Sequence, residues 1–107
     1  MSCLVEKSGQ LLSVQRDDGV VRAVGEVDAS TCSQLDEVLH TLDGEEPALV
    51  DLSEVTFMDS SGLRVLIEHH YLRADHGGRL VILNPSRPVG RLLEVTGLDA
   101  VLYLVSE

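Results

Sequence analysis

Apolar residues along this chain follow two spacings, which alternate from one end to the other. Short runs of strand length, rich in Leu and Val, cover 11–14, 20–24, 48–52, 80–83 and 101–105. Three longer segments repeat apolar residues at intervals of three and four, as one face of a helix does. These segments extend from about 31 to Leu42, from Ser60 to about Asp75, and from 87 to 96. The pattern predicts the order β, β, α, β, α, β, α, β.

Turn residues mark where these elements are expected to end. Asp18-Gly19 lies between the first two runs, and an Asp-Gly pair in that position is a strong hairpin signal. Gly25 is expected to end the second strand. Asp28 and Ser30 are both candidates for the residue that caps the following helix, because their side-chain oxygens accept bonds from free backbone N–H groups.

Strands that alternate with helices after an initial hairpin favour parallel pairing through right-handed crossovers. The expected fold class is therefore α/β: one domain over residues 1–107, with a mixed sheet, an N-terminal hairpin and about three packing helices. Within the first helix, a stripe is expected to face the core, made of Leu35, Val38, Leu39 and Leu42. Asp36, Glu37 and His40 are expected to face water.

The stretch between the third strand and the second helix carries the most chemistry. A loop is expected over 53–58, with Phe57 and Met58 plugging the core beneath it. Asp59-Ser60-Ser61-Gly62 then stands at the helix start, where Asp and Ser are common caps. The dipole and free N–H groups of a helix N-terminus tolerate added negative charge. A serine here can carry a phosphate, although simple capping explains the same residues.

The second helix is expected to bury one apolar face and to show polar side chains on the other. Its apolar face is predicted to consist of Leu63, Leu66, Ile67 and Ala74. Four further residues cannot all be buried and are expected to include the outer side: Arg64, Glu68, His69 and Tyr71. His69 and His70 are expected to be surface or boundary histidines. His69-His70 is not expected to chelate a metal, because adjacent helical residues point about 100° apart. In the third helix, Ser86 is the expected cap, and the apolar side is Val89, Leu92, Leu93 and Val95.

Composition and charge exclude several classes of function. The net charge of −10 argues against binding to nucleic acid or to an anionic membrane surface. No apolar run approaches the roughly 20 residues that span a bilayer, and the first residues do not resemble a secretory signal. A cytoplasmic location is therefore expected. Cys3 and Cys32 form no CxxC pair, so we expect two thiols and no zinc site.

Motifs for catalysis do not occur. The residues around Ser60 do not form a GxSxG elbow, and the chain has no GxxxxGK[ST] loop. Its single lysine, Lys7, lies in the N-terminal segment. The sequence therefore favours a binding protein over an enzyme, with no cofactor and no metal.

The run from Val55 to Leu63, VTFMDSSGL, resembles the signature of STAS domains that act as bacterial anti-sigma factor antagonists. The segments 25–31, GEVDAST, and 91–98, RLLEVTGL, resemble the same family. The resemblance implies that Ser60, the serine directly after the Asp, is phosphorylated by an anti-sigma factor that is itself a kinase. It also implies that Asp28 lies beside this serine and helps to bind the partner.

The resemblance further implies a partner switch. The unmodified protein would bind a serine-kinase anti-sigma factor and free the sigma factor; phosphorylation would end binding, and a serine phosphatase would reset the protein. The implied partner-binding residues are Asp28, Asp59, Ser60, Ser61, Gly62 and Arg64. Arg64 departs from the family, which often has a small residue there. Two alternatives stay open: a STAS-type nucleotide-binding module, and a constitutive scaffold in which Ser60 only caps the helix.

Overall fold

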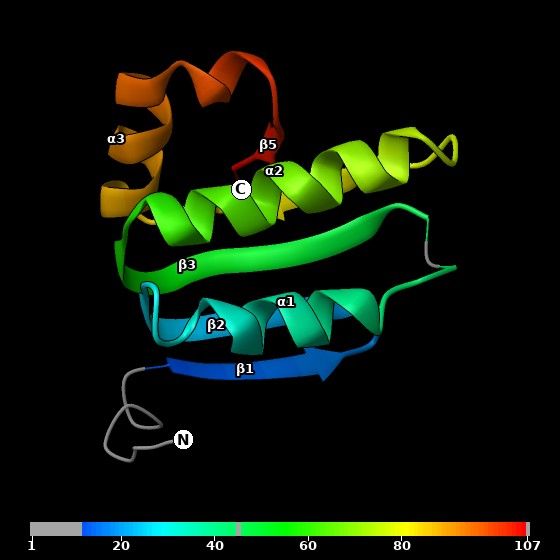
Figure 1. Cartoon of the computed structure of the whole chain (residues 1–107), viewed down its shortest axis with the longest axis horizontal. Helices are drawn as coiled ribbons and strands as arrows, with labels where there is room; N and C mark the ends of the chain where they lie inside the picture. The colour runs from blue at the N-terminus through cyan, green and yellow to red at the C-terminus, as the bar shows by residue number, and fades with distance from the viewer. Residues whose placement is uncertain (1–11, 45, 107) are drawn as a thin grey trace.

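The structure is a computed structural model that describes residues 12–44 and 46–106. Its centre is a five-stranded sheet in which the spatial order of the strands follows the chain order (Figure 1). The strands are β1 (Leu12–Asp17), β2 (Val20–Val27), β3 (Ala48–Met58), β4 (Leu80–Leu83) and β5 (Tyr103–Val105). β1 and β2 pair antiparallel, and all later neighbours pair parallel. The predicted mixed sheet with an N-terminal hairpin is confirmed.

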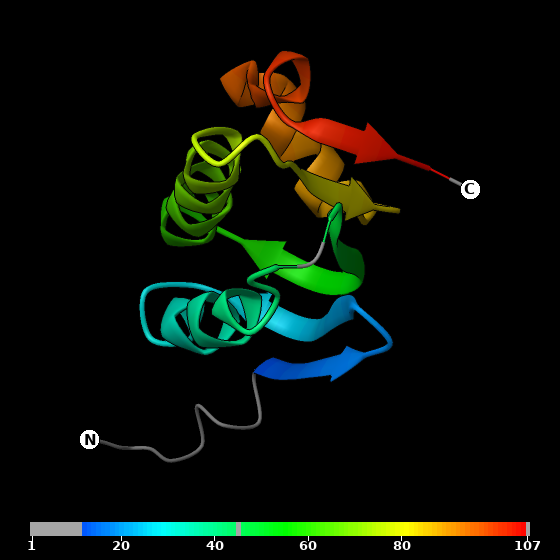
Figure 2. The ribbon, with the colours of Figure 1, turned by 90° about the vertical axis from the view of Figure 1, so that its right-hand side faces the viewer.

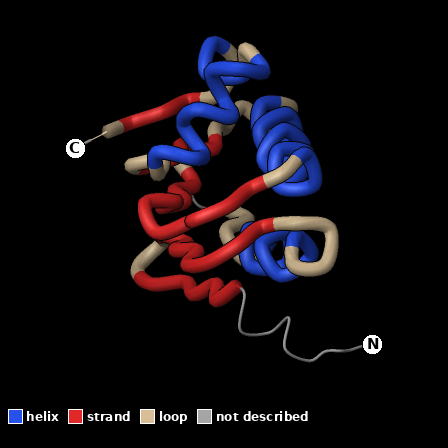
Figure 3. Tube along the Cα trace, turned by 90° about the vertical axis from the view of Figure 1, so that its left-hand side faces the viewer, coloured by secondary structure: helices blue, strands red, loops and turns tan. Residues whose placement is uncertain are grey.

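Helices connect the parallel strands, as the alternating pattern predicts. They are α1 (Cys32–His40), α2 (Ser60–Ala74) and α3 (Arg87–Thr96), followed by a short 3-10 helix, η2 (Leu98–Ala100). α1 and α2 lie side by side on one face of the sheet, whereas α3 lies apart from them and packs against β3 (Figures 1 and 2). Figure 3 shows the same separation from the opposite side. Among the described helices, none combines the length and apolar character needed to cross a membrane.

The core consists almost entirely of aliphatic side chains between the sheet and the helices. Leu35 and Leu39 of α1 and Leu63 and Leu66 of α2 are buried, as their spacing predicts. On the sheet side, fully buried positions include Val21, Val27, Val50, Leu52 and Ile82. Burying each such side chain contributes about 1.5–3 kcal/mol, so this layer supplies most of the driving force for folding.

Several of the residues predicted to form turns and helix ends adopt the backbone angles that these positions require. Asp18 and Gly19 have φ values of 54° and 78°, the left-handed pair that a tight hairpin turn requires. Gly97 follows α3 with φ 78°. At the other end of α3, the side chain of Ser86 accepts a hydrogen bond from the N–H of Val89, which confirms Ser86 as its cap.

β3 is longer than predicted. The segment 53–58, predicted as a loop, continues the strand to Met58 and pairs with β2. Its burial pattern is irregular, because two exposed residues, Thr56 and Phe57, separate the buried Val55 and Met58, so the strand does not alternate regularly. Phe57 was expected to plug the core but is 47% exposed, whereas Met58 is buried as predicted.

β2 is also longer than predicted. Gly25 does not end it; the residue adopts φ 119° within the strand, at a shift in register with β3. This bulge bends the strand without ending the pairing, which continues to Val27.

Three predictions about helix faces are wrong. His69, expected at the surface or its boundary, is buried at 3% exposure because it pairs with an acidic side chain of α1. Ala74, placed on the buried face, is exposed at the last turn of α2. Val95 is 75% exposed, because α3 turns only Val89 and Leu93 fully into the core.

Candidate functional site

The candidate site lies where β2 and β3 end. The two strands are parallel, so their carboxyl ends meet at one edge of the sheet, with Val27 paired to Met58. The backbone N–H of Asp59 donates to the carbonyl of Val27 at 3.1 Å, which ties the two chain segments together one residue further on. The loop that begins at Asp28 and the start of α2 are therefore neighbours, although about 30 residues separate them in sequence.

Asp59 is the cap of α2. It has extended backbone angles, and its Oδ1 accepts a hydrogen bond from the N–H of Ser61 at 2.9 Å. Ser60 is the first helical residue, and it is solvent-exposed. Both Asp59 and Ser60 were candidate caps by sequence, and the residue that caps α2 is Asp59. The Ser60 side chain is at the surface.

Asp28 organises the loop before α1. Its Oδ1 accepts hydrogen bonds from the N–H of Ser30 at 2.9 Å, the hydroxyl of Ser30 at 2.8 Å and the N–H of Thr31 at 3.1 Å. The residue at the N-cap position is Thr31, so the prediction that Asp28 or Ser30 occupies that position is wrong. The Ser30 hydroxyl bond, followed by the other bonds to Ser30 and Thr31, lowers the pKa of Asp28 against the opposing effect of burial. Asp28 is therefore a fixed negative charge at neutral pH.

A cavity of about 360 Å³ lies between α2 on one side and, on the other, the first turns of α1 and the loop that precedes them. Its lining from α2 is Ser60, Ser61, Arg64, Val65 and Glu68, and its lining from the other side is Ala29, Cys32, Ser33 and Asp36. Residues four apart on a helix share a face, so Ser60, Arg64 and Glu68 form a row along this cavity. Of the predicted site residues, the structure brings Ser60, Ser61 and Arg64 to one surface.

Cys32 and Asp36 also line this cavity and were not predicted as site residues. Burial raises the pKa of the Cys32 thiol, and the negative charge of Asp59 raises it further. This cysteine is therefore a protonated thiol at neutral pH rather than a reactive thiolate. The only sequence signal for its position was the resemblance of the preceding loop to a partner-binding segment. Cys3 lies outside the described residues.

Gly62 differs from the other predicted site residues because it is buried. A Cβ atom built on it would lie 2.6 Å from Cγ of Met58 and 2.8 Å from Cγ1 of Val27. The missing side chain lets the first turn of α2 approach the ends of β2 and β3. Gly62 thus sets the position of Ser60 instead of offering a side chain to the surface.

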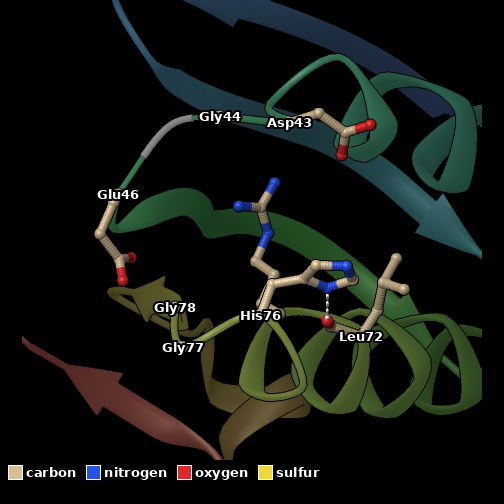
Figure 4. Close-up of a pocket in the computed structure, with 8 residues that line it drawn as sticks. Asp43, Gly44, Glu46, Leu72, His76, Gly77 and Gly78 are labelled. Atoms are coloured by element: carbon tan, nitrogen blue, oxygen red, sulfur yellow. Dashed lines mark hydrogen bonds between the residues drawn. The ribbon is translucent and has the colours of Figure 1, made fainter.

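A second cavity, of about 460 Å³, lies at the opposite end of α2 (Figure 4). Asp43, Gly44 and Glu46 face it from one side, and Leu72, His76, Gly77 and Gly78 from the other. His76 Nδ1 lies 2.9 Å from the carbonyl oxygen of Leu72, and the Glu46 carboxylate accepts a bond from the N–H of Arg79 at 3.1 Å. These contacts lie around the C-terminal end of α2. None of the predicted site residues lines this cavity.

Residues 11–106 match the family described as "Mlab, STAS domain". The chain is 35% identical to an anti-sigma-B factor antagonist of Staphylococcus aureus (strain NCTC 8325 / PS 47) over 86 residues, which cover 78% of this chain and 80% of that relative. An anti-sigma-B factor antagonist of Staphylococcus epidermidis is 33% identical over 86 residues, which again cover 78% of this chain and 80% of that relative.

Solved structures show the same fold. An anti-sigma factor antagonist from Mycobacterium paratuberculosis superimposes with a TM-score of 0.71 at 28% identity, covering 88% of this chain and 83% of that one. SpoIIAA in its unphosphorylated form gives 0.71 at 22% identity (90% and 87% covered), and Bacillus SpoIIAA in its phosphorylated form gives 0.65 at 20% identity (90% of each covered). The chain belongs to the STAS domain family of anti-sigma factor antagonists.

Proposed function

We propose that this protein is an anti-sigma factor antagonist that works as a phosphorylation switch rather than as an enzyme. Unmodified, it binds an anti-sigma factor that is a serine kinase, and the sigma factor is released. Phosphate on Ser60 ends this binding, and a serine phosphatase restores it. The names of the curated relatives support the antagonist role. The proposed kinase, phosphorylation and phosphatase steps are supported by the resemblance of the Asp59-Ser60-Ser61-Gly62 run to the family signature and by the position of Ser60.

The observation that carries the proposal is the exposure of Ser60 at the first position of α2. A kinase needs access to the hydroxyl, and this hydroxyl is not required as the helix cap, because Asp59 caps the helix. A phosphate at this position lies near the positive end of the helix dipole, which stabilises negative charge. Arg64, four residues on and lining the same cavity, supplies a cation on the same face.

The surrounding charges explain how a phosphate can act as a signal. Asp36 and Glu68 line the cavity with Ser60, and Asp59 directly precedes it. Phosphorylation adds about −1.5 to −2 charge at pH 7 to this already acidic surface. A partner that fits the neutral serine must then desolvate a dense group of negative charges, which disfavours binding.

The same charges argue against the nucleotide-binding alternative. A nucleotide phosphate at the start of α2 would meet Arg64, but Asp36 and Glu68 line the same cavity and would repel it. The scaffold alternative requires that Ser60 act only as a cap, and this role belongs to Asp59. We therefore favour the switch over both alternatives.

The first prediction concerns the modified residue. Incubation of the purified protein with its cognate kinase and ATP should place phosphate on Ser60, and phosphopeptide mapping will identify the residue. Ser60→Ala should abolish labelling, whereas Ser61→Ala, the matched control one residue on, should still be labelled. Ser61 donates its N–H to the Asp59 carboxylate and is only half-exposed, so its hydroxyl is the poorer acceptor. Phosphate found on Ser61 would contradict this proposal.

The second prediction concerns stability. Phosphorylation of Ser60 should change the free energy of unfolding by about 1 kcal/mol or less, because charge at a helix N-terminus is tolerated. Urea unfolding of the modified and unmodified proteins, followed by circular dichroism, measures this difference. A large loss of helical signal on phosphorylation would mean that release of the partner results from unfolding rather than from charge.

A further inference from the structure

Three side chains of α1 and α2 converge at one point between the helices, and the proposed switch involves only one of them, Asp36. Asp36 and His40 are four residues apart on α1 and therefore share a face of that helix. His69 reaches the same point from the buried face of α2. His69 is 3% exposed, His40 is exposed and Asp36 is half-buried, so the cluster extends from the helix–helix contact to the solvent.

The distances within this cluster are those of groups arranged around one centre. Oδ1 of Asp36 lies 2.8 Å from Nε2 of His69 and 3.5 Å from Nε2 of His40. The two imidazole rings are 4.6 Å apart between centroids and inclined at 62°. One donor atom from each of the three residues lies within 4.8 Å of the other two.

We propose that Asp36, His40 and His69 bind a divalent transition-metal ion, with zinc as the reference ion. Zinc bound to nitrogen and carboxylate oxygen at about 2.0–2.2 Å in tetrahedral geometry separates its ligand atoms by roughly 3.3 Å. The two separations that involve Asp36, 2.8 Å and 3.5 Å, lie on either side of this value, and the third ligand separation lies within 4.8 Å. The exposed His40 side chain can adjust. Two imidazoles and one carboxylate suit zinc, cobalt, nickel or copper, whereas calcium and magnesium prefer all-oxygen sites.

The hydrogen bond between Asp36 and His69 accounts for the burial of His69, and the four-residue spacing on α1 brings His40 to the same carboxylate. The second imidazole also directs Nε2 toward the same carboxylate oxygen, although it is exposed and has water available as a partner. Three protein ligands with one side open to solvent leave room for a water molecule as the fourth ligand and provide an entry path. The net charge of −10 further favours a cation.

The site would tie α1 to α2 at His69, which lies nine residues, or about 14 Å, along α2 from Ser60. Asp36 belongs both to this cluster and to the lining of the Ser60 cavity. The metal site does not depend on the switch, since it needs neither phosphate nor a partner. The sequence does not reveal this cluster, because Asp36, the hydrogen-bond partner of His69, is 33 residues away on another helix.

Calorimetric titration of the metal-free protein with Zn²⁺, and absorption spectroscopy with Co²⁺, test the proposal. We expect one equivalent to bind, with cobalt d–d bands and without a sulfur-to-metal charge-transfer band. His40→Gln and Asp36→Asn should each weaken binding by more than about tenfold, because loss of even an indirect ligand contact costs 10–100-fold. His69→Gln should do the same, and if it does not fold, the exposed His40 position still decides the question.

Two control variants locate the site. His76→Gln removes an exposed histidine outside the cluster and should bind zinc like the wild type. The double substitution Cys3→Ser and Cys32→Ser removes both thiols and should also leave zinc binding unchanged. Failure to bind one equivalent would overturn the proposal. It would also be overturned by undiminished binding in His40→Gln and Asp36→Asn, or by loss of binding in either control variant.

Discussion

Phosphorylation of Ser60 is expected to weaken the complex with the kinase anti-sigma factor by about a hundredfold or more. Each 1.4 kcal/mol corresponds to about tenfold in affinity, and burying a phosphate of about −1.5 to −2 charge beside acidic groups costs several kcal/mol. Asp59, the cap of α2, and Glu68 of α2 supply such groups, and Arg64 on the same face partly offsets their charge. Calorimetric titration of the phosphorylated and unphosphorylated proteins against the kinase measures the difference.

Two substitutions separate charge from shape at this position. Ser60→Ala removes the hydroxyl and should keep wild-type affinity while becoming impossible to switch off. Ser60→Asp should weaken binding only partly, because one carboxylate carries less charge than a phosphate. Ser13→Asp adds the same charge at an exposed position of β1 and should leave affinity unchanged. Equal affinity for Ser60→Ala, Ser60→Asp and the wild type would place Ser60 outside the interface.

The elements that the sequence predicts best are those set by local chemistry. β4 is found at Leu80–Leu83 as predicted, because it is a short apolar run bounded by turn residues. α2 begins at Ser60 as predicted, because Asp59 is a cap that acts within two residues of itself. The four-residue spacing of Ser60 and Arg64 is equally local, since it places both residues on one face of α2.

The features that the sequence did not reveal depend on contacts between distant segments. The tail of β3 contains polar residues and is held as a strand by pairing with β2, so its own composition resembles a loop. His69 is polar and was assigned to the surface, but it is buried because Asp36 of α1 pairs with it. Cys32 and Asp36 join the Ser60 cavity only because α1 and α2 pack side by side, which no local pattern specifies.

The same alanine substitution is expected to have opposite effects at two helical glycines. Gly62→Ala should lower the free energy of unfolding by about 2 kcal/mol, because overpacking of a core costs about 1–3 kcal/mol. The new methyl would collide with the side chains of Met58 and Val27, and Val27 is fully buried. For a domain of this size, the melting temperature should fall by about 10 °C.

Gly90 of α3 is the matched control. A Cβ atom built there meets no atom within 4 Å, so Gly90→Ala should gain helix propensity without a clash. Alanine is favoured over glycine in a helix interior by about 0.8–1 kcal/mol, and stability should rise by roughly that amount. Parallel urea titrations of the two variants and the wild type measure both effects. If Gly62→Ala were as stable as Gly90→Ala, the close approach of α2 to the ends of β2 and β3 would not require glycine. The exposed position of Ser60 would then need another structural explanation.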